Sequence, residues 1–308
     1  MPKFSVIIPN YNHSTYLKTR IDSVLSQDFQ DFEIIILDDY STDNSKEIIE
    51  TYRDHDKIGV IIYNGKNTGN TFKQWEKGLK MANGDLIWIA ESDDFIANTF
   101  LSEASVAFDL HKNIGIFCCG TNLVNNNGEI LHIIESEGEN DIIDGKTFVF
   151  QSMSTMNPLC NASAIIFKKK FIQLPIGKDI TNLRYCGDWL FWSKILLQTD
   201  IFLLRKNLNY YRRHEDSISP RAIAEGLIHL EGILVFKFIR KKLSNNFSTL
   251  WSEQDHTWAK NILYAPYSYA IKTKFLFRAL QANPVILLLF IYHRINRTLS
   301  KIHLLFNS

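Results

Sequence analysis

Residues 85–95 read DLIWIAESDDF, in which a short apolar run passes directly into three acids, Glu91, Asp93 and Asp94. The apolar run is typical of a buried strand. Three carboxylates so close together repel one another, and burial makes their ionised forms costlier still. A divalent cation bound through carboxylate oxygens would offset this repulsion. The alternative is a solvated turn in which Asp93 or Asp94 caps a helix that begins near Asn98.

The order of an apolar strand followed by an amphipathic helix repeats through the first part of the chain. Strands are expected at residues 4–9, 32–39, 58–63, 85–90 and 114–119, and helices at 14–26, 43–53, 72–82 and 98–110. Continuously apolar strands that alternate with helices indicate a parallel sheet covered on both faces. The sequence therefore predicts an α/β fold with a doubly wound, mainly parallel sheet flanked by helices.

Polar residues gather where the predicted strands end. Tyr11 follows the first strand, Asp38 and Asp39 end the second, and Asp93 with Asp94 follows the fourth. The carboxyl ends of parallel strands share one edge, where ligands bind in such sheets. A nucleotide base stacked on Tyr11, with its imide N–H donated to a carboxylate, would suit this edge. A phospho-receiver module also has paired acids after a strand, but this chain is far longer than such a module.

The second half is less regular and ends in helices. It predicts a β-ribbon at residues 128–134, a strand at 161–167, a helix at 187–198, short strands at 201–204 and 208–211, and helices from about residue 220 onward.

Two positions in the second half are candidates for chemistry. Asp188, beside Trp189 at the start of a predicted helix, is either a general base or an N-cap of that helix. His214 follows a short strand and stands next to Arg212 and Arg213, so these side chains are candidates to contact a metal or a diphosphate. A lone histidine is more often structural.

Composition excludes several classes of protein. The chain has 308 residues, of which 45% are hydrophobic and 22% charged, and this is globular rather than disordered or fibrous. A net charge of +1 argues against a nucleic-acid binder with a basic face. The four cysteines lack metal-ligand spacing and are typical of a reducing compartment. The N-terminal apolar run is too short for a signal peptide, so a cytoplasmic location is expected.

The C-terminal segment differs in charge from the rest. Residues 256–308 contain seven basic residues and no acid. The apolar run at residues 285–292 is too short to span a bilayer, and basic residues flank it in a helical pattern. We expect residues 271–308 either to lie on an anionic membrane surface or to pack on the domain as an ordinary helix.

Two long stretches carry a family resemblance. They are FSVIIPNYNHSTYLKTRIDSVLSQDFQDFEIIILDDYSTDNS at residues 4–45 and NTGNTFKQWEKGLKMANGDLIWIAESDD at residues 67–94. Together they resemble a family 2 glycosyltransferase of the GT-A fold, of the type that builds bacterial surface polysaccharides. The resemblance extends in the same order over about residues 3–216.

The resemblance implies roles for the matching positions. These are Pro9, Tyr11, Asp38, Asp39, Glu91 and Asp93 for the nucleotide, Asp94 and His214 for the metal, and Asp188 as the catalytic base, with Arg212, Arg213 and Trp189 as weaker candidates for contact with the diphosphate or acceptor. Asp39 would face the imide of a pyrimidine, and Asp94 would be the last acid of the metal motif. Glu91 stands where the family has an aspartate, and Trp75 where it usually has a basic residue.

The function implied is that of an inverting glycosyltransferase assisted by Mg²⁺ or Mn²⁺, which moves a sugar from a UDP- or dTDP-linked donor to a glycan or lipid-linked acceptor. The expected domains are a GT-A domain at residues 1–216, with a nucleotide half to about 120 and an acceptor half from 121, and a helical extension at 217–308. Peripheral attachment to the cytoplasmic face of the inner membrane is expected through residues 271–308. A non-catalytic nucleotide-sugar or glycan-binding module is the alternative. A nucleotidyltransferase fits less well, because PNYNHSTY has no glycine after the first strand.

Overall fold

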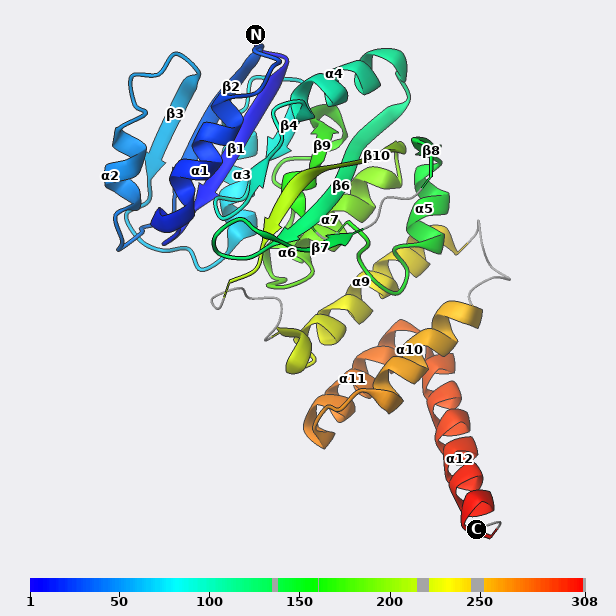
Figure 1. Ribbon diagram of the computed structural model, residues 1–308. Coiled ribbons are helices and arrows are strands. Elements are labelled where there is room, and N and C mark those ends of the chain that lie inside the picture. Colours follow the sequence, from blue (N-terminus) through cyan, green and yellow to red (C-terminus); the bar gives the residue numbers. More distant parts are fainter. Residues whose placement is uncertain (135–137, 160, 215–221, 245–251, 307–308) are drawn as a thin grey trace. The chain divides into compact units, whose positions relative to one another are not determined.

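The computed structural model describes residues 1–134, 138–159, 161–214, 222–244 and 252–306 (Figure 1). The chain forms two compact units. The first unit contains Met1–Phe148 and Leu159–Asp216, and the second contains Val149–Pro158 and Ser217–Ser308.

One mixed sheet organises the first unit, with the strand order β3-β2-β1-β4-β9-β6-β10-β5 and with β7 and β8 paired to β6 and β10. The strands are β1 (Phe4–Asn10), β2 (Phe32–Asp38), β3 (Ile58–Tyr63), β4 (Leu86–Ile89), β5 (Phe95–Ile96), β6 (Ile114–Val124), β7 (Ile130–Ile134), β8 (Asp141–Ile143), β9 (Ile165–Lys168) and β10 (Asp200–Arg212). Strands β3, β2, β1 and β4 are parallel, and so are β6 and β10. Strand β9 runs antiparallel between β4 and β6.

Helices accompany these strands. They are α1 (Ser14–Leu25), α2 (Ser45–Glu50), α3 (Thr71–Met81), α4 (Phe100–Leu110), α5 (Gly145–Gln151), α6 (Lys178–Thr181) and α7 (Gly187–Leu196), with short 3-10 turns at Ala162–Ala164 and Lys169–Phe171. Strand β1 is buried along its whole length, and Leu17, Ile21 and Val24 of α1 are buried as well. Helix α3 lies close to the sheet, since a Cβ added at Gly78 would stand 2.4 Å from a methyl carbon of Ile7. The predicted α/β class with a mainly parallel sheet and flanking helices is confirmed.

Three predicted elements differ in extent. Strand β6 continues to Val124, because its distal part pairs with both β7 and β10. The two short strands expected at 201–204 and 208–211 form one strand, β10, whose register against β6 shifts between Leu204 and Asn209. The polar residues inside that irregularity interrupt the apolar pattern, so the sequence alone suggested a break.

The second unit is helical where the structure describes it. Its helices are α9 (Leu227–Leu243), α10 (Ser252–Tyr264), α11 (Tyr269–Ala282) and α12 (Pro284–Phe306). Trp258 is buried and donates its indole N–H to the carbonyl of Ser154, which ties the segment Val149–Pro158 to this unit. Buried Asp255 pairs with Arg240 at 2.7 Å and accepts a hydrogen bond from Asn283 at 2.7 Å. None of the helices in the described residues combines the length and apolar character that a membrane span requires.

Candidate functional site

The carboxyl ends of β1, β2 and β4 meet at one edge of the sheet. Asn10 lies opposite Asp38 in the parallel register, and Ile89 at the end of β4 lies opposite Ile7 of β1. The segments that follow these strands therefore emerge together. They carry Tyr11, Asp38 with Asp39, and the 91–94 turn, as the sequence predicts.

Tyr11 and Pro9 differ in exposure at this edge. The side chain of Tyr11 is 44% exposed and is therefore partly accessible to a ligand. Pro9 is buried within β1 opposite Leu37. Asn12 has a positive φ of 56°, a backbone state that asparagine adopts more readily than most residues, and this turns the chain sharply after β1.

Asp38 and Asp39 are both buried and both accept hydrogen bonds from the protein. Asp38 accepts from the Asn10 amide at 2.8 Å and from the backbone N–H of Ser41 at 2.9 Å, and the Ser41 hydroxyl lies 2.6 Å from it. These bonds tie the end of β2 to the end of β1.

Asp39 accepts hydrogen bonds from residues between β3 and α3 and from α3 itself. Its oxygens accept from Asn64 at 2.6 Å, from Gln74 at 2.8 Å, and from the hydroxyl of Thr68 at 2.7 Å and its backbone N–H at 3.0 Å. These donors take up the lone pairs that a carboxylate offers. A pyrimidine imide would therefore have to replace one of them in order to bind Asp39.

Asp94 points into the protein. It is 1% exposed and accepts from Asn161 at 2.8 Å, from the Ser163 hydroxyl at 2.8 Å and from the backbone N–H of Arg212 at 2.9 Å. Burial and the neighbouring charge of Asp93 raise the pKa of Asp94, whereas Arg20 opposes the rise. Asp94 thus belongs to an internal hydrogen-bond network, and the metal role that the resemblance implies for it stays a prediction.

Arg20 is the cation of this network, and the sequence analysis did not single it out. Its side chain is fully buried, with Nη2 3.9 Å from Asp94 and Nε donating to the carbonyl of Glu91 at 2.8 Å. Burial lowers the pKa of Arg20 to about 10, while Asp94 works against that lowering. Its spacing in the sequence could have revealed it, because Arg20 falls three residues after Leu17 and four before Val24, on the same buried face of α1.

Glu91 is half-buried and contacts Trp75. The indole N–H of Trp75 donates to Oε1 of Glu91 at 3.0 Å. Burial and the negative charge of Asp93 raise the pKa of Glu91 to about 8. Trp75 and Glu91, the two residues that the resemblance marked as unusual, are therefore hydrogen-bond partners.

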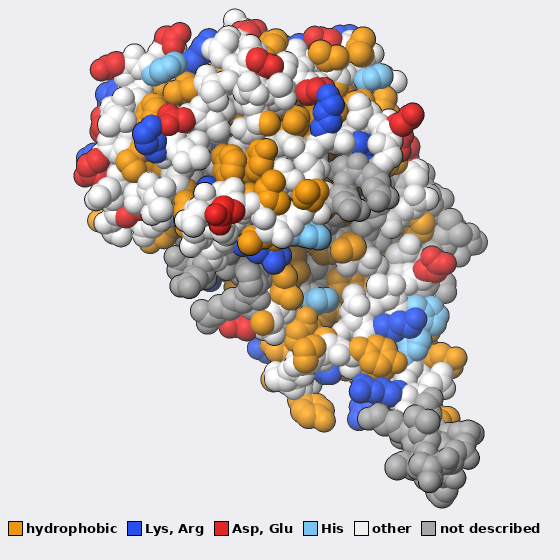
Figure 2. All heavy atoms as spheres, in the orientation of Figure 1, with side chains coloured by type: hydrophobic (Ala, Val, Ile, Leu, Met, Phe, Trp, Pro, Cys, Tyr) orange, Lys and Arg blue, Asp and Glu red, His pale blue; other side chains and the backbone are white. Residues whose placement is uncertain are grey.

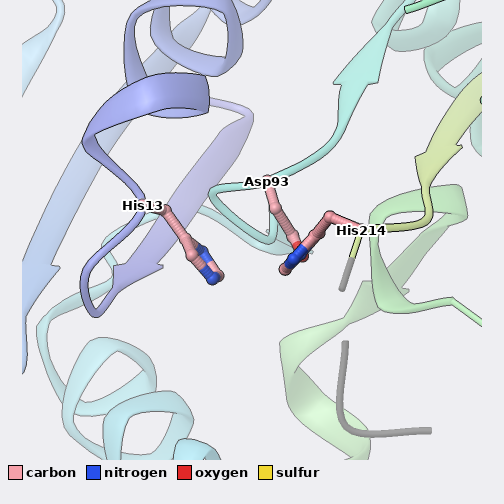
Figure 3. Close-up of side chains that lie close together, drawn as sticks. All are labelled: His13, Asp93 and His214. Carbon is pink, nitrogen blue, oxygen red and sulfur yellow. The ribbon is translucent and has the colours of Figure 1, made fainter. Parts of the chain in front are cut away.

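Asp93 points toward two histidines, His13 and His214 (Figure 3). Its Oδ2 lies 3.2 Å from Nε2 of His214, and one ligand atom from each of His13, Asp93 and His214 lies within 4.8 Å of the others. Burial raises the pKa of Asp93, but the hydrogen bond from His214 and the charge of His13 outweigh it, so the net pKa is lowered.

This arrangement fits a divalent cation. Imidazole nitrogens and an ionised carboxylate are both ligands that such cations use in proteins. The three residues come from the ends of three different elements, β1, β4 and β10, and only the fold brings them together. The sequence analysis named Asp94 and His214 for the metal. Among the described residues His214 lies together with Asp93 and with His13, which the sequence analysis did not single out.

Arg212, a candidate for contact with the diphosphate, is buried and bonded to backbone carbonyls. It is 4% exposed, and its guanidinium donates to the carbonyls of Asp93 at 2.9 Å, Asn125 at 2.8 Å and Asn126 at 2.6 Å. It also lies 4.7 Å from the centre of the Tyr16 ring. Arg212 therefore anchors the 91–94 turn through the carbonyl of Asp93. Arg213, the next residue, is exposed.

Asp188 lies in the first turn of α7. The residue at the N-cap of this helix is Cys186, so Asp188 is not the cap that a purely structural interpretation expects. Its side chain is half-buried. A carboxylate in the first turn lies in the positive field of the helix N-terminus, which favours its ionised form.

Trp189, a candidate for contact with the acceptor, is buried. It is 3% exposed and belongs to the buried side of α7. Nearby, Trp192 packs against Trp75 of α3 at 5.7 Å between ring centres. A Cβ on Gly187 would stand 2.4 Å from the ring of Phe72, so only glycine fits where α7 meets α3. These contacts fix the start of α7, and with it the position of Asp188.

The turn at 91–94 does not serve as a helix cap. Helix α4 begins at Phe100 with Thr99 at its N-cap, and no side chain caps it. The acids of the turn therefore have partners other than a helix terminus.

Comparison with known proteins identifies a family. The family model described as Glycosyl transferase family 2 matches residues 5–173. The poly(ribitol-phosphate) beta-N-acetylglucosaminyltransferase TarS of Staphylococcus aureus is 36% identical over 115 residues, which are 37% of this chain and 20% of TarS. An uncharacterized glycosyltransferase of Nostoc sp. is 28% identical over 216 residues, covering 69% of this chain and 65% of that protein. The chain thus matches only part of the length of these relatives.

Two solved structures share the fold. Residues 1–349 of Staphylococcus aureus TarS in complex with UDP superpose with a TM-score of 0.66 at 22% identity, covering 92% of this chain and 81% of that one. The mannosyltransferase PcManGT of Pyrobaculum calidifontis, in complex with GDP-Man and Mn²⁺, gives a TM-score of 0.58 at 16% identity, covering 96% and 80%. At these identities the likeness shows the GT-A fold alone.

Proposed function

The chain belongs to glycosyltransferase family 2, and on that premise we propose that it transfers a sugar from a nucleotide diphosphate donor to a hydroxyl group of a glycan or lipid-linked acceptor. One observation carries this proposal. The cluster of His13, Asp93 and His214, suited to a cation, lies at the same sheet edge as exposed Tyr11 and the acids that end β2. A nucleotide diphosphate needs both, a surface for its base and a cation for its phosphates.

The base end of the donor site would consist of Tyr11, Asp38 and Asp39. An exposed aromatic ring offers a stacking surface, and the carboxylates offer acceptors for the imide N–H of a pyrimidine. We therefore favour a UDP- or dTDP-linked sugar, with the imide replacing one of the protein donors on Asp39. The TarS structure solved with UDP-GlcNAc supports a uridine donor.

The phosphate end would be held by Mg²⁺ or Mn²⁺ on Asp93 and His214, with Asp94 supporting the turn from inside the protein. When bound, the cation supplies positive charge that offsets the charge developing on the departing diphosphate. Arg213, exposed beside His214, adds a cationic side chain at the same place. Glu91, two residues before Asp93, remains a candidate to contact the donor ribose, although its Oε1 already accepts the indole N–H of Trp75.

Asp188 is proposed as the base for a single displacement. Its carboxylate takes the proton from the acceptor hydroxyl while that oxygen forms a bond to the anomeric carbon. The bond from this carbon to the diphosphate oxygen breaks, and the electron pair leaves with the diphosphate. Attack from the face opposite the leaving group inverts the anomeric configuration, through a transition state with oxocarbenium character.

A binding and transfer assay tests this function. Thermal unfolding is followed with UDP-, dTDP- and GDP-sugars, each with and without Mn²⁺, because a ligand that binds only the folded state raises its stability. We expect a pyrimidine-linked sugar with Mn²⁺ to raise the unfolding temperature and to be consumed when an acceptor is added. Binding without hydrolysis or transfer in any combination would instead support a non-catalytic binding module.

Membrane contact is proposed for the C-terminal helix of the second unit. Val285, Leu288, Tyr292, Ile295 and Leu299 of α12 are between 44% and 65% exposed and recur every three to four residues. They form one stripe along the helix, while Ile286 and Phe290 are buried. The chain has seven basic residues and no acid after Asp255.

This charge complements an anionic lipid surface. Figure 2 shows hydrophobic and basic side chains together on the part of the chain that contains α10, α11 and α12. A second copy would bring the same positive charge to the contact, and so fits less well than lipid. We propose that residues 1–216 carry the transfer site and residues 217–308 attach the protein to the cytoplasmic face of the membrane, where a lipid-linked acceptor for surface polysaccharide would be available.

A further inference from the structure

His13 contributes a second imidazole to the cluster that faces Asp93. It follows β1 and directly precedes α1, while Asp93 follows β4 and His214 follows β10. The three side chains point toward one another (Figure 3), and their ligand atoms lie within 4.8 Å. His13 is at the N-cap of α1 and makes no cap hydrogen bond; its ring instead contacts Ser92 in the 91–94 turn.

The backbone before His13 gives it this direction. Asn12 adopts the left-handed conformation, with a φ of 56°. Its backbone N–H donates to the hydroxyl of Ser41 at 2.9 Å, and its side-chain oxygen accepts from the N–H of Thr42 at 2.7 Å. The loop after β2 therefore holds the turn that presents His13. Backbone strain of this kind persists where the surroundings fix it, commonly at functional sites.

A hydrogen bond also fixes the ring. Nδ1 of His13 lies 2.8 Å from the hydroxyl oxygen of Ser92. When Nδ1 carries the proton and donates it to Ser92, Nε2 keeps its lone pair for a ligand. Histidines that bind metals are usually oriented in this way through their other ring nitrogen. Ser92 lies between Glu91 and Asp93, so the same turn supplies a ligand and orients another.

The aromatic neighbours restrict both rings further. The rings of His13 and His214 are 5.7 Å apart, and Tyr16 lies 5.3 Å from His214. Tyr16 in turn lies under the guanidinium of Arg212. The imidazoles are thus held by packing as well as by hydrogen bonds, which is the support that a metal site needs.

We propose that His13 is a third protein ligand of the cation, and that the resulting set of two imidazoles and one carboxylate makes the site prefer a transition-metal cation such as Mn²⁺ or Co²⁺ over Mg²⁺. Mg²⁺ prefers oxygen ligands and binds imidazole poorly, whereas first-row transition cations bind nitrogen well, with affinity rising from Mn²⁺ to Co²⁺. This inference rests on the proposed function for the identity of the site. The coordination positions left open would be available to phosphate oxygens of the donor.

Metal binding by the full chain tests the inference without any assay of transfer. Affinities for Mn²⁺, Co²⁺ and Mg²⁺ are measured by calorimetry in the absence of nucleotide and again with UDP, for the wild type and for His13→Gln. We expect the wild type to bind Mn²⁺ at least about tenfold more tightly than Mg²⁺. His13→Gln should weaken Mn²⁺ binding about tenfold or more and leave Mg²⁺ binding nearly unchanged.

Spectroscopy supplies a second readout. Pulsed electron paramagnetic resonance of bound Mn²⁺ should show nitrogen couplings from two imidazoles in the wild type and from one in His13→Gln. His55→Gln is the matched control, because His55 is an exposed histidine of the same unit, paired with Asp56. That variant should match the wild type in every measurement. Ser92→Ala, which keeps the ligand but removes its orienting partner, should weaken Mn²⁺ binding by a smaller factor.

The outcomes separate this inference from the proposed function. Equal affinity of the wild type for Mn²⁺ and Mg²⁺, no Mn²⁺ binding in either condition, or unchanged couplings in His13→Gln would overturn it, even if sugar transfer occurs. A selective site lost in His13→Gln supports it, even if no nucleotide sugar is ever consumed. Thermal unfolding without metal checks that each variant is folded.

Discussion

Nε2 of His214 lies 3.2 Å from Oδ2 of Asp93, although 121 residues separate them in the chain. The next residue, Asp94, faces away from this pair and accepts the backbone N–H of Arg212 at 2.9 Å. Asp93 and Asp94, although adjacent in one turn, therefore have different roles. Asp93 faces the candidate cation site, and Asp94 holds that site together from within the protein.

Substitution of these two acids should give opposite phenotypes. Asp93→Asn should abolish Mn²⁺ binding and change stability by less than about 1 kcal/mol, because its carboxylate is partly open to solvent. Asp94→Asn should cost about 3–5 kcal/mol of unfolding free energy, because it leaves the buried charge of Arg20 without its counter-ion. Urea unfolding and calorimetry with Mn²⁺ measure the two effects. The assignment fails if Asp94→Asn is stable and Asp93→Asn retains the metal.

Asp188→Asn should bind donor and cation as the wild type does and lose transfer by a factor of about 10²–10⁴, the usual contribution of a general base. Asp179→Asn is the control. Asp179 lies on the nearby helix α6, is half exposed and pairs with Lys194, so its loss should leave transfer within about twofold. Single-turnover rates at saturating donor separate chemistry from binding. Full activity of Asp188→Asn would remove it as the base.

Gly187→Ala should strain the contact between α7 and α3. The added Cβ would stand 2.4 Å from the Phe72 ring, and overpacking of this kind costs about 1–3 kcal/mol. Because Asp188 is the next residue, transfer should fall as well. Combining the change with Phe72→Leu should recover part of both losses. Additive losses in the double variant would show that the two residues do not compete for space.

Glu33 should stabilise the first unit in a pH-dependent way. It lies on β2 and accepts from the Ser5 hydroxyl at 2.6 Å and from the backbone N–H of Asn83 at 2.7 Å. Burial raises the pKa of Glu33, but these donors outweigh it and the net pKa is lowered. A depressed folded pKa means that the stabilisation is complete above the unfolded pKa of about 4.3 and is lost as the pH falls through the folded pKa.

Glu33→Gln should therefore cost about 1–2 kcal/mol at pH 7 and progressively less below about pH 4. Urea unfolding across this pH range measures the difference. Glu47→Gln, at an exposed position in the first turn of α2, should stay within about 0.5 kcal/mol of the wild type at every pH. A constant difference between Glu33→Gln and the wild type would exclude the titration of Glu33 as the cause.

Replacing Leu288 and Ile295 together by glutamate should release the protein from vesicles that contain anionic lipid. Both side chains lie on the exposed stripe of α12, 65% and 53% exposed. Val106→Glu, at an equally exposed apolar position on α4, should bind as the wild type does. Sedimentation with neutral and anionic vesicles at low and high salt measures this. A dimer in light scattering that the double change dissociates would mean that a second copy, and not lipid, covers the stripe.

The sequence predicts most of the strands whose carboxyl ends form the edge of the sheet where the site lies. Apolar runs at 4–9, 32–39 and 85–90 place strands, and the parallel arrangement makes their ends meet, so Tyr11, Asp38 and the 91–94 turn were expected together. Strand β9 was harder, because its antiparallel insertion between β4 and β6 depends on a partner distant in sequence. Local periodicity carries no signal for that choice.

Trp75 and Glu91 show a second limit. At each of these two positions the resemblance leads one to expect a different residue, and neither difference is explained by the residue alone. The structure joins them by a hydrogen bond of 3.0 Å, so that the indole N–H partly satisfies a carboxyl group that burial makes hard to ionise. The sequence does not show that these two residues are in contact, because they lie on different elements that only the tertiary structure brings together.

The sequence by itself determined the α/β fold, the edge at which the acids gather and the family, because these depend on local patterns and on the order of elements. The tertiary structure alone decided which acid of the pair faces the site, that His13 joins Asp93 and His214, and that Arg20 neutralises Asp94. In a tight turn, successive side chains point in different directions. Which direction is buried depends on partners such as Ser163 and Arg212, which lie 69 and 118 residues further along the chain.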